Sequence, residues 1–311
     1  MAPIAKWVRA YCAPVDRSTE TPTWFDASSA FDFDAPPPPW VALGYVANLK
    51  RAGVTKLTSM LAGTKGAVAA QFRATLGAKV SFDFVGWGKL QMALAGGSQH
   101  MNVLATNGAG GSGTGNPAVP PVAVLAGSSA TELVLGAGAV SAFNVGDMVA
   151  CDVDYAQQTG YVGSPAAAYV TDPANVNRDR DYLRRVTFNV ARIGSVTTTS
   201  LELTQPLVSG APAAGAQVQK VMAFADREGG SFFQEWSLLL ALEPESGGQV
   251  CFYYPRVQAC APESEAAIKC ESYEASALHA ELSALPMTDP VDGEQVACYR
   301  TYVPANNADV Y

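Results

Sequence analysis

The chain has 311 residues, of which 49% are hydrophobic and 15% charged, and its formal net charge is −8. This length suits one large or two ordinary domains, and the low charge with 28 Gly and 20 Pro is typical of a β-rich globular protein, which argues against a disordered chain or a coiled coil. The sequence has no run of about 18 apolar residues and no apolar stretch of signal-peptide type near Met1, so we expect no membrane insertion, and synthesis in a cytoplasm.

Residues 1–42 are predicted to form a loop-rich N-terminal arm. Four prolines, Pro36 to Pro39, precede Trp40. A proline run adopts the extended polyproline II conformation and acts as a stiff spacer. We therefore expect an arm that leaves the body of the fold and packs either on its own domain or on a neighbouring subunit.

Residues 68–85 alternate between apolar and polar around Gly77, which predicts two strands and a tight turn. Side chains of one parity face one side of a strand, so Leu76, Phe82 and Phe84 are expected on the core face. The opposite face then carries Arg73, Thr75, Ser81 and Asp83, with Lys79 beside them.

After Gly86-Trp87-Gly88 the apolar spacing becomes helical, which predicts a short helix that ends at the glycine pair Gly96-Gly97. The Gly/Ser-rich segment 108–117 then marks a linker. Beyond it, short strands separated by turn residues predict a small antiparallel β-barrel inserted at residues 107–228. Its expected strands are 122–125, 132–135, 147–153, 185–193, 200–203 and 217–224.

Alternation returns after Gly229-Gly230, with expected strands at 231–243, 249–254 and 294–303. The spacing at 273–285 fits a helix or a bent strand, and we favour a strand. These segments would complete the sheet begun by residues 43–85, so residues 43–106 and 229–311 are expected to form one core.

Charge is unevenly distributed along the chain. Residues 1–106 carry ten bases and six acids, residues 107–228 seven and ten, and residues 229–311 three and twelve. The basic and acidic segments can neutralise each other inside the subunit, meet across a subunit boundary, or simply form solvated faces.

Neither a metal nor a cofactor site is expected. None of the six cysteines forms a C-x-x-C pair, and neither His100 nor His279 lies near a cysteine in sequence, so zinc-site spacing is missing. We expect buried free cysteines, with pairing among those at 251–298 left open for an oxidising medium. The glycines at 108–113 match G-x-G-x-x-G, and those at 136–138 follow a strand, but neither group begins a helix that could hold a phosphate.

No catalytic constellation is apparent either. The two histidines lack a G-x-S-x-G elbow or a neighbouring acid at a fixed spacing. We therefore expect that the chain is not an enzyme.

The segment from Leu43 to Leu104 reads LGYV-x-NLKR, then a long hairpin, then WGKLQMALA-x-GSQ and NVL. This sequence pattern resembles that of the tail tube proteins of long-tailed, siphovirus-like bacteriophages. The resemblance is good over residues 40–105 and weaker over 230–303. The resemblance implies an all-β fold with one short flanking helix, in which a tail-tube-type β-sandwich or barrel core carries the inserted small β-barrel. It also implies a structural protein of the virion tail.

By the same resemblance, the subunits assemble with themselves into stacked rings, typically hexameric. The rings form a channel for double-stranded DNA in transit without specific binding, and they meet other tail proteins: tape measure, tail terminator and tail tip. On the strand pattern, the lumen-facing candidates are Arg73, Thr75, Ser81, Asp83 and Gln234, with Glu235 or Glu243 as possible sources of negative charge. The inter-subunit candidates are Lys79 and Lys89.

Two alternatives remain open from the sequence. One is another ring-forming protein, such as a tail terminator or a secretion-system tube. The other is a carbohydrate-binding surface module of a virion.

Overall fold

The computed structural model describes residues 5–16, 19–27, 31–54, 56–62, 67–104, 106–107, 116–117, 121–152, 189–207, 210–227, 234–244, 248–260 and 277–304. The chain divides into two compact units, residues 1–97 with 234–311, and residues 98–233. The second unit is thus inserted into the first. Its limits lie a few residues outside the predicted limits of 107 and 228, because residues 99–104 pair with strands of the second unit.

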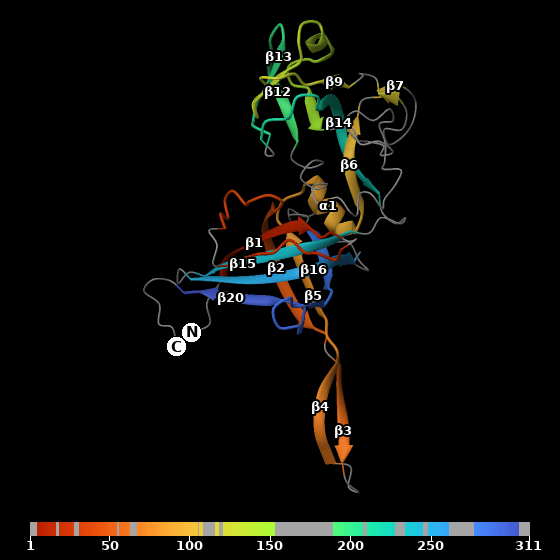
Figure 1. Ribbon diagram of the computed structural model, residues 1–311, viewed down its shortest axis with the longest axis vertical. Helices are drawn as coiled ribbons and strands as arrows, with labels where there is room; N and C mark the ends of the chain where they lie inside the picture. Colours follow the sequence, from red (N-terminus) through yellow and green to blue (C-terminus); the bar gives the residue numbers. More distant parts are fainter. Residues whose placement is uncertain are drawn as a thin grey trace, which may run out of the picture. The chain divides into compact units, whose positions relative to one another are not determined.

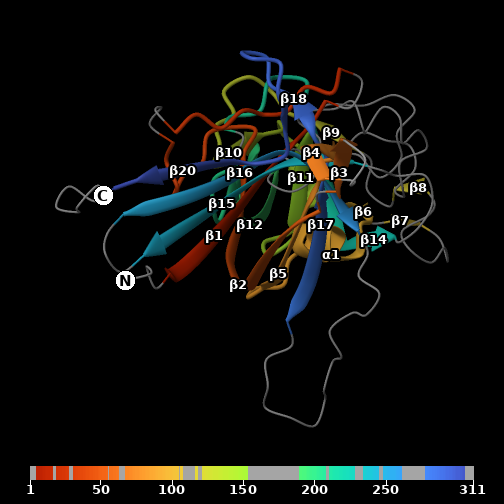
Figure 2. The same ribbon diagram turned by 90° about the horizontal axis from the view of Figure 1, so that it is seen from below.

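Six antiparallel strands of the first unit close into a barrel, in the pairing order β15–β1–β2–β5–β17–β16 and back to β15. Figure 2 shows β1, β2, β15, β16 and β20 side by side. Strand β20 (Tyr299–Val303) also pairs with β16 but does not belong to this closed ring of six strands. The barrel strands are β1 (Ala5–Pro14), β2 (Val41–Gly53), β5 (Ala78–Phe84), β15 (Glu235–Pro244), β16 (Gln249–Cys260) and β17 (Leu278–Ala284). The fold is all-β, as expected.

Strand β5 shows how the alternation builds the barrel core. Val80, Phe82 and Phe84 are at most 1% exposed, and the residues between them are partly exposed. Across the ladder, Phe82 lies opposite Ala280 of β17, so a large side chain meets a small one in the interior. The core face predicted for Phe82 and Phe84 is confirmed.

The segment predicted to be an arm is part of the first unit. Strand β1 lies between β15 and β2 in the barrel, which corrects the expectation that residues 1–42 leave the fold. Residues 19–27 and 31–40 are here called the strap. They cover the face of β1, β15 and β16 that points away from the barrel interior. Phe25, Phe31, Phe33 and Trp40 of the strap form a core with buried barrel residues, among them Tyr11, Leu239 and Tyr253. The proline run, Pro36 to Pro39, is followed by Trp40, whose side chain packs into this core.

The predicted turn at Gly77 does not join two paired strands. Strand β4 (Ala67–Thr75) pairs with β3 (Lys56–Ala62), and β5 pairs with β2 and β17. Val54 N–H donates to Gly77 O where the two ladders meet. Strands β3 and β4 therefore form the continuation of one long β2–β5 hairpin, which extends away from the barrel in Figure 1.

The predicted helix is present as α1 (Lys89–Gly96). It ends at Gly97, which adopts the left-handed conformation (φ 62°) and donates its N–H to Ala93 O, as helix C-caps require. Gln91 Nε2 donates to Leu43 O, which ties the helix to β2. The helix buries Leu90, Ala93, Leu94 and Ala95.

The second unit is a small antiparallel β-barrel with its own core. Its strands pair in the order β10–β13–β12–β11–β14, and β9 pairs with β14. Leu125, two residues after β9, donates its N–H to Val134 O of β10, which joins the first and last strands of this order. The core contains Leu133, Ile193, Leu201 and Val218, each at most 1% exposed. The strands are β9 (Val122–Ala123), β10 (Glu132–Val134), β11 (Met148–Asp152), β12 (Val190–Val196), β13 (Ser200–Leu203) and β14 (Gln217–Arg227).

Strand β14 continues past the small barrel and pairs with β6 (Gln99–Leu104), so that Gln99 lies opposite Arg227. The beginning and the end of the inserted unit are therefore neighbours. The remaining elements are the pairs β7 (Thr106–Asn107) with β8 (Asn116–Pro117) and β18 (Met287–Thr288) with β19 (Gln295–Val296), and the 3-10 turn η2 (Ala139–Ala142).

Candidate assembly surface

The outward face of β2, β5 and β17 is polar and carries several of the predicted residues. Asp83 on β5 lies directly opposite His279 on β17, and 2.7 Å separates Asp83 Oδ1 from His279 Nδ1. Asn48 on β2 donates from Nδ2 to Asp83 Oδ2 at 2.7 Å. Asn48 can reach because β2 bulges between Ala47 and Lys50, with Asn48 in the left-handed region (φ 53°). One carboxylate thus connects three adjacent strands.

The pKa of Asp83 reflects this arrangement. Burial alone would raise it, but hydrogen bonds from Asn48 and His279 favour the ionised form, and the net result is a pKa below the ordinary value. The same face carries the ion pair of Lys79 Nζ with Glu281 Oε1 at 2.6 Å. Lys79 of β5 and Glu281 of β17 therefore offset each other inside the subunit, in line with one of the three possibilities left open by the sequence.

The β3–β4 hairpin offers a different kind of surface. Its two strands pair only with each other among the described strands. Leu57, Met60 and Val68 are 57%, 60% and 55% exposed. Gln71 Nε2 donates to Ser59 Oγ across the ladder at 3.2 Å, and Lys56 and Arg73 are exposed on the same hairpin. The β3–β4 hairpin thus carries exposed apolar and basic side chains on two strands that, within the described part of the chain, pair with no further strand.

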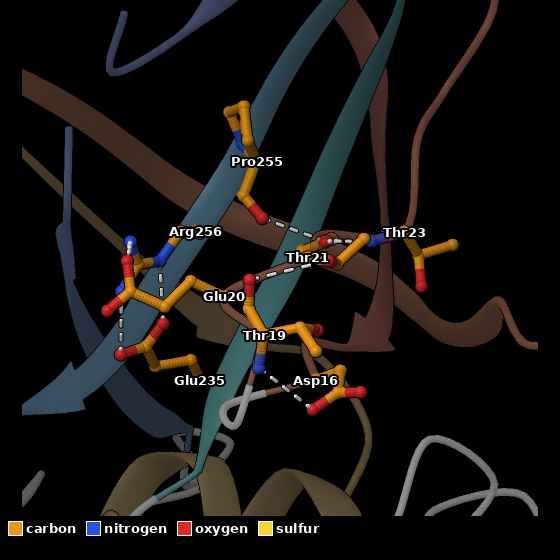
Figure 3. Close-up of polar contacts among 9 residues, drawn as sticks. Asp16, Thr19, Glu20, Thr21, Thr23, Glu235, Pro255 and Arg256 are labelled. Carbon is orange, nitrogen blue, oxygen red and sulfur yellow. Dashed lines mark hydrogen bonds and ion pairs between the residues drawn. The ribbon is translucent and has the colours of Figure 1, made fainter. Parts of the chain in front are cut away.

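The strap is fixed to one end of the barrel by a partly buried polar cluster, shown in Figure 3. Arg256 of β16 contacts Glu235 Oε2 through Nε at 2.7 Å and Glu20 Oε2 through Nη1 at 2.9 Å. Glu235 is 5% exposed, so the arginine compensates a buried carboxylate. Thr23 N–H donates to Ser237 Oγ, and Ser237 donates in turn to Pro255 O. These contacts hold the strap in place.

The predicted lumen and interface residues fall in three places. Ser81 and Asp83 lie on the outward polar face of β5, partly exposed. Arg73 and Thr75 are on β4 of the hairpin, where Arg73 is exposed and the side chain of Thr75 lies outside the described part. Gln234 is only 5% exposed, so it presents no surface to a channel in the single chain. Its side-chain amide has no hydrogen-bond partner among the described residues.

The acidic candidates of the last strands are also engaged within the chain. Glu235 pairs with Arg256, and Glu243 Oε1 lies 3.2 Å from Arg9 Nε. Lys79, a predicted inter-subunit residue, contacts Glu281 within the chain. Lys89 begins α1 and is partly buried, and burial lowers the pKa of its ammonium group to about 7. Lys79 is therefore an exposed candidate with a partner in its own chain, and Lys89 is a partly buried one.

The sequence reasoning missed Asn48, His279 and Glu281. His279, Glu281 and Ser283 share a parity, so reading residues 273–285 firmly as a strand would have placed them together on the outward face. The bulge at Asn48 had no comparable signal, because a polar residue within a strand pattern does not reveal a positive φ.

The described residues contain neither a metal-ligand cluster nor a membrane-spanning helix. Within them, no group of three or more His, Cys, Asp or Glu side chains is placed to hold a metal ion. Cys12, Cys151 and Cys251 are buried free thiols, and Cys260 and Cys298 are partly exposed free thiols; Cys270 lies outside the described part. Among the described helices, none is long and apolar enough to span a membrane.

No protein-family model matches the chain, and no curated protein matches it.

Proposed function

We propose that this protein is a structural subunit of a bacteriophage tail tube, without catalytic activity. In this proposal, subunits form rings, typically hexamers, and the rings stack into a channel through which double-stranded DNA passes. The observation that carries the proposal is the β3–β4 hairpin, which extends from a closed barrel and leaves apolar side chains exposed. The residues that resemble tail tube proteins, 43–104, form this hairpin and the strands and helix on either side of it.

A hairpin of this kind favours an assembling protein over a monomeric one. A two-stranded ribbon without a third strand or a packed layer is marginally stable in water. Unpaired strand edges and exposed apolar side chains are also sites of uncontrolled association unless a partner covers them. A subunit that assembles gains such a partner, whereas a monomer would keep the liability.

The outward face of β2, β5 and β17 is the proposed channel lining. Lys79 and Glu281 offset each other there, and Asp83 is held ionised by Asn48 and His279. A face with balanced charge suits DNA in transit, because each phosphate bound by an unpaired base releases counterions and adds affinity that would slow passage. Ser81 and Asp83 therefore remain lumen candidates, and Glu281 takes the place of Glu235 and Glu243 as the acidic contribution of the later strands.

Other tail proteins complete the proposal. A tube of this kind ends against a tail terminator and a tail tip and encloses a tape measure protein, so the mature location is the virion tail. The second unit, with its own core and adjacent ends, is an addition that the tube does not need for closure.

Negative-stain electron microscopy of the purified chain tests the function. Rings or tubes of uniform width are expected, and a monodisperse monomer at every concentration would contradict the proposal. Single cysteines at Ser81 and Asp83, in a background with Cys260, Cys270 and Cys298 changed to serine, test the lining. They should react with a small thiol reagent but not with one too large to enter the tube.

A further inference from the structure

Arg51 of β2 is held in a defined position by residues that are distant in the sequence. Its Nε donates to the Tyr254 hydroxyl at 2.5 Å, and its Nη2 donates to Cys298 Sγ at 3.4 Å. Its Cζ lies 3.8 Å from the ring centroid of Phe252, a distance at which a guanidinium and an aromatic face attract each other. Nη1 takes part in neither bond, so the exposed arginine still has N–H donors to offer.

A second arginine lies beside the same ring. Arg300 of β20 is directly opposite Phe252 of β16, and residues opposite each other in a ladder place their side chains on one face of the sheet. Burial raises the pKa of the Cys298 thiol, and the positive charges of Arg51 and Arg300 oppose that rise, so both guanidinium groups are near this thiol. Arg300 is exposed, as Arg51 is. Two positive charges therefore gather around one aromatic ring.

Neither of these arginines has an acidic partner in the part of the chain that the structure describes, although the sequence holds more acids than bases. Arg9 and Arg256, by contrast, each contact two carboxylates. Like charges held close together repel each other, and a bound anion removes that cost. The pair is therefore suited to an anion from outside the chain.

The charge and shape of this site favour a phosphate group over a single carboxylate. A guanidinium binds either oxyanion with two parallel hydrogen bonds, but a phosphate monoester carries about −1.5 to −2 charges near neutral pH and has oxygens enough for two arginines. Tyr302 follows Arg300 on the same face of β20 and is 53% exposed. A Cβ at Gly248 would come within 3.2 Å of Tyr302 Cε2, so the ring lies close to the glycine backbone. Its exposed surface can stack on a nucleobase.

We infer that Arg51 and Arg300 bind a phosphate group, either free phosphate or the 5′-phosphate of a nucleotide. In the second case the base stacks on Tyr302. The hydrogen bonds of Arg51 within the chain already orient its guanidinium, which lowers the entropic cost of binding. The inference goes beyond the proposed function and does not depend on it, because all these residues belong to the first unit of one chain.

Isothermal titration calorimetry of the full chain with inorganic phosphate and with AMP tests the site. At low ionic strength and about pH 7.5, where a phosphate monoester is mostly dianionic, the unchanged chain should bind at least one of the two probes. Arg300→Gln should weaken that binding by about tenfold or more, and Arg51→Gln/Arg300→Gln should weaken it further. Arg51→Lys keeps the charge but loses the planar fork, and a loss of roughly tenfold is expected.

The matched control is Arg73→Gln/Arg192→Gln, which neutralises two exposed arginines elsewhere and should bind like the unchanged chain. Circular dichroism checks that each variant keeps its sheet signal. Arg300→Gln keeps the test decisive even if the loss of Arg51 unfolds the barrel, because Arg51 alone of the two has hydrogen bonds to other strands among the described residues.

Tyr302→Ala and adenosine identify the source of the phosphate. If the base stacks, Tyr302→Ala should weaken AMP binding by about fivefold or more and leave inorganic phosphate unaffected. Equal affinities for AMP and phosphate, both insensitive to Tyr302→Ala, would assign the site to free phosphate. Adenosine has no phosphate and should bind at least about tenfold more weakly than AMP.

Three results would overturn the inference: no binding of either probe, binding that survives in a folded Arg51→Gln/Arg300→Gln variant, or acetate binding as tightly as phosphate. None of them bears on whether the chain forms rings or tubes, so the proposed function is judged separately by electron microscopy.

Discussion

Asp83 of β5 and His279 of β17 face each other across an antiparallel ladder, with 2.7 Å between Oδ1 and Nδ1. An ionised carboxylate only accepts hydrogen bonds, so Nδ1 carries the shared proton. On the other side of β5, Asn48 donates to the second carboxylate oxygen. The outward face of the barrel therefore has a polar connection across three strands whose interior face is held by apolar packing.

The Asp83→Asn variant tests this connection through pH. The pKa of Asp83 in the folded state lies below its ordinary value of about 3.9, so its ionised form stabilises the fold above pH 4. That contribution is lost as the pH falls through the folded-state pKa. We expect Asp83→Asn to lower the free energy of unfolding by about 1–3 kcal/mol at pH 7, and this difference should shrink below about pH 4. Urea unfolding at several pH values measures it.

Ser81→Ala is the matched control, because it changes a side chain on the same face of β5 without removing a charge. It should leave the pH dependence of unfolding unchanged. A stability difference for Asp83→Asn that is the same at pH 7 and pH 3 would show that the ionised carboxylate contributes nothing particular.

Removing Arg256 should strongly destabilise the first unit. Arg256→Met leaves Glu235 buried without its charged partner, which costs roughly 3–5 kcal/mol. The double variant Arg256→Met/Glu235→Gln removes the uncompensated charge and should recover part of the loss. Thermal unfolding followed by circular dichroism compares the two, and equal stability of the single and double variants would contradict the buried-charge explanation.

The strap should contribute to stability through its aromatic core. Trp40 is 5% exposed and packs edge-on to Phe31 and Tyr253. Trp40→Ala is expected to cost about 3–5 kcal/mol of unfolding free energy, because it opens a cavity in a packed cluster. Trp24→Ala, at a strap position that is 43% exposed, should cost clearly less. Similar losses at the two positions, measured by denaturant unfolding, would show that the strap does not form a specific core.

The second unit should be removable. Gln99 and Arg227 are paired across β6 and β14, which places their Cα atoms about 5 Å apart. Replacing residues 100–226 with a two-residue Asn-Gly turn should therefore close the chain without strain and leave a soluble barrel. Residues 98–228 alone should also fold, because they contain a core of their own. Aggregation of the shortened chain, or an isolated unit without cooperative unfolding, would indicate that the two cores depend on each other.

Much of the secondary structure was determined by local pattern. Alternation placed Phe82 and Phe84 on the core face, Gly97 ended the helix because it tolerates a positive φ, and the strand expected at 200–203 is present as β13. These features depend on residues close together in the sequence. The sequence also indicated that the second unit is inserted into the first, because the composition changes where one core ends and the other begins.

Only the tertiary structure decided which strands pair and which charges meet. Residues 67–84 alternate in the same way whether β4 pairs with β5 or with β3, because period two defines the faces of a strand and not its neighbour. The pairing of Arg256 with Glu235 and the burial of Gln234 likewise depend on strands distant in sequence. Strand β1 looked like part of an arm because its place in the barrel comes from β2 and from β15, more than 220 residues further along the chain. Periodicity determined the elements, and long-range packing decided how they were combined.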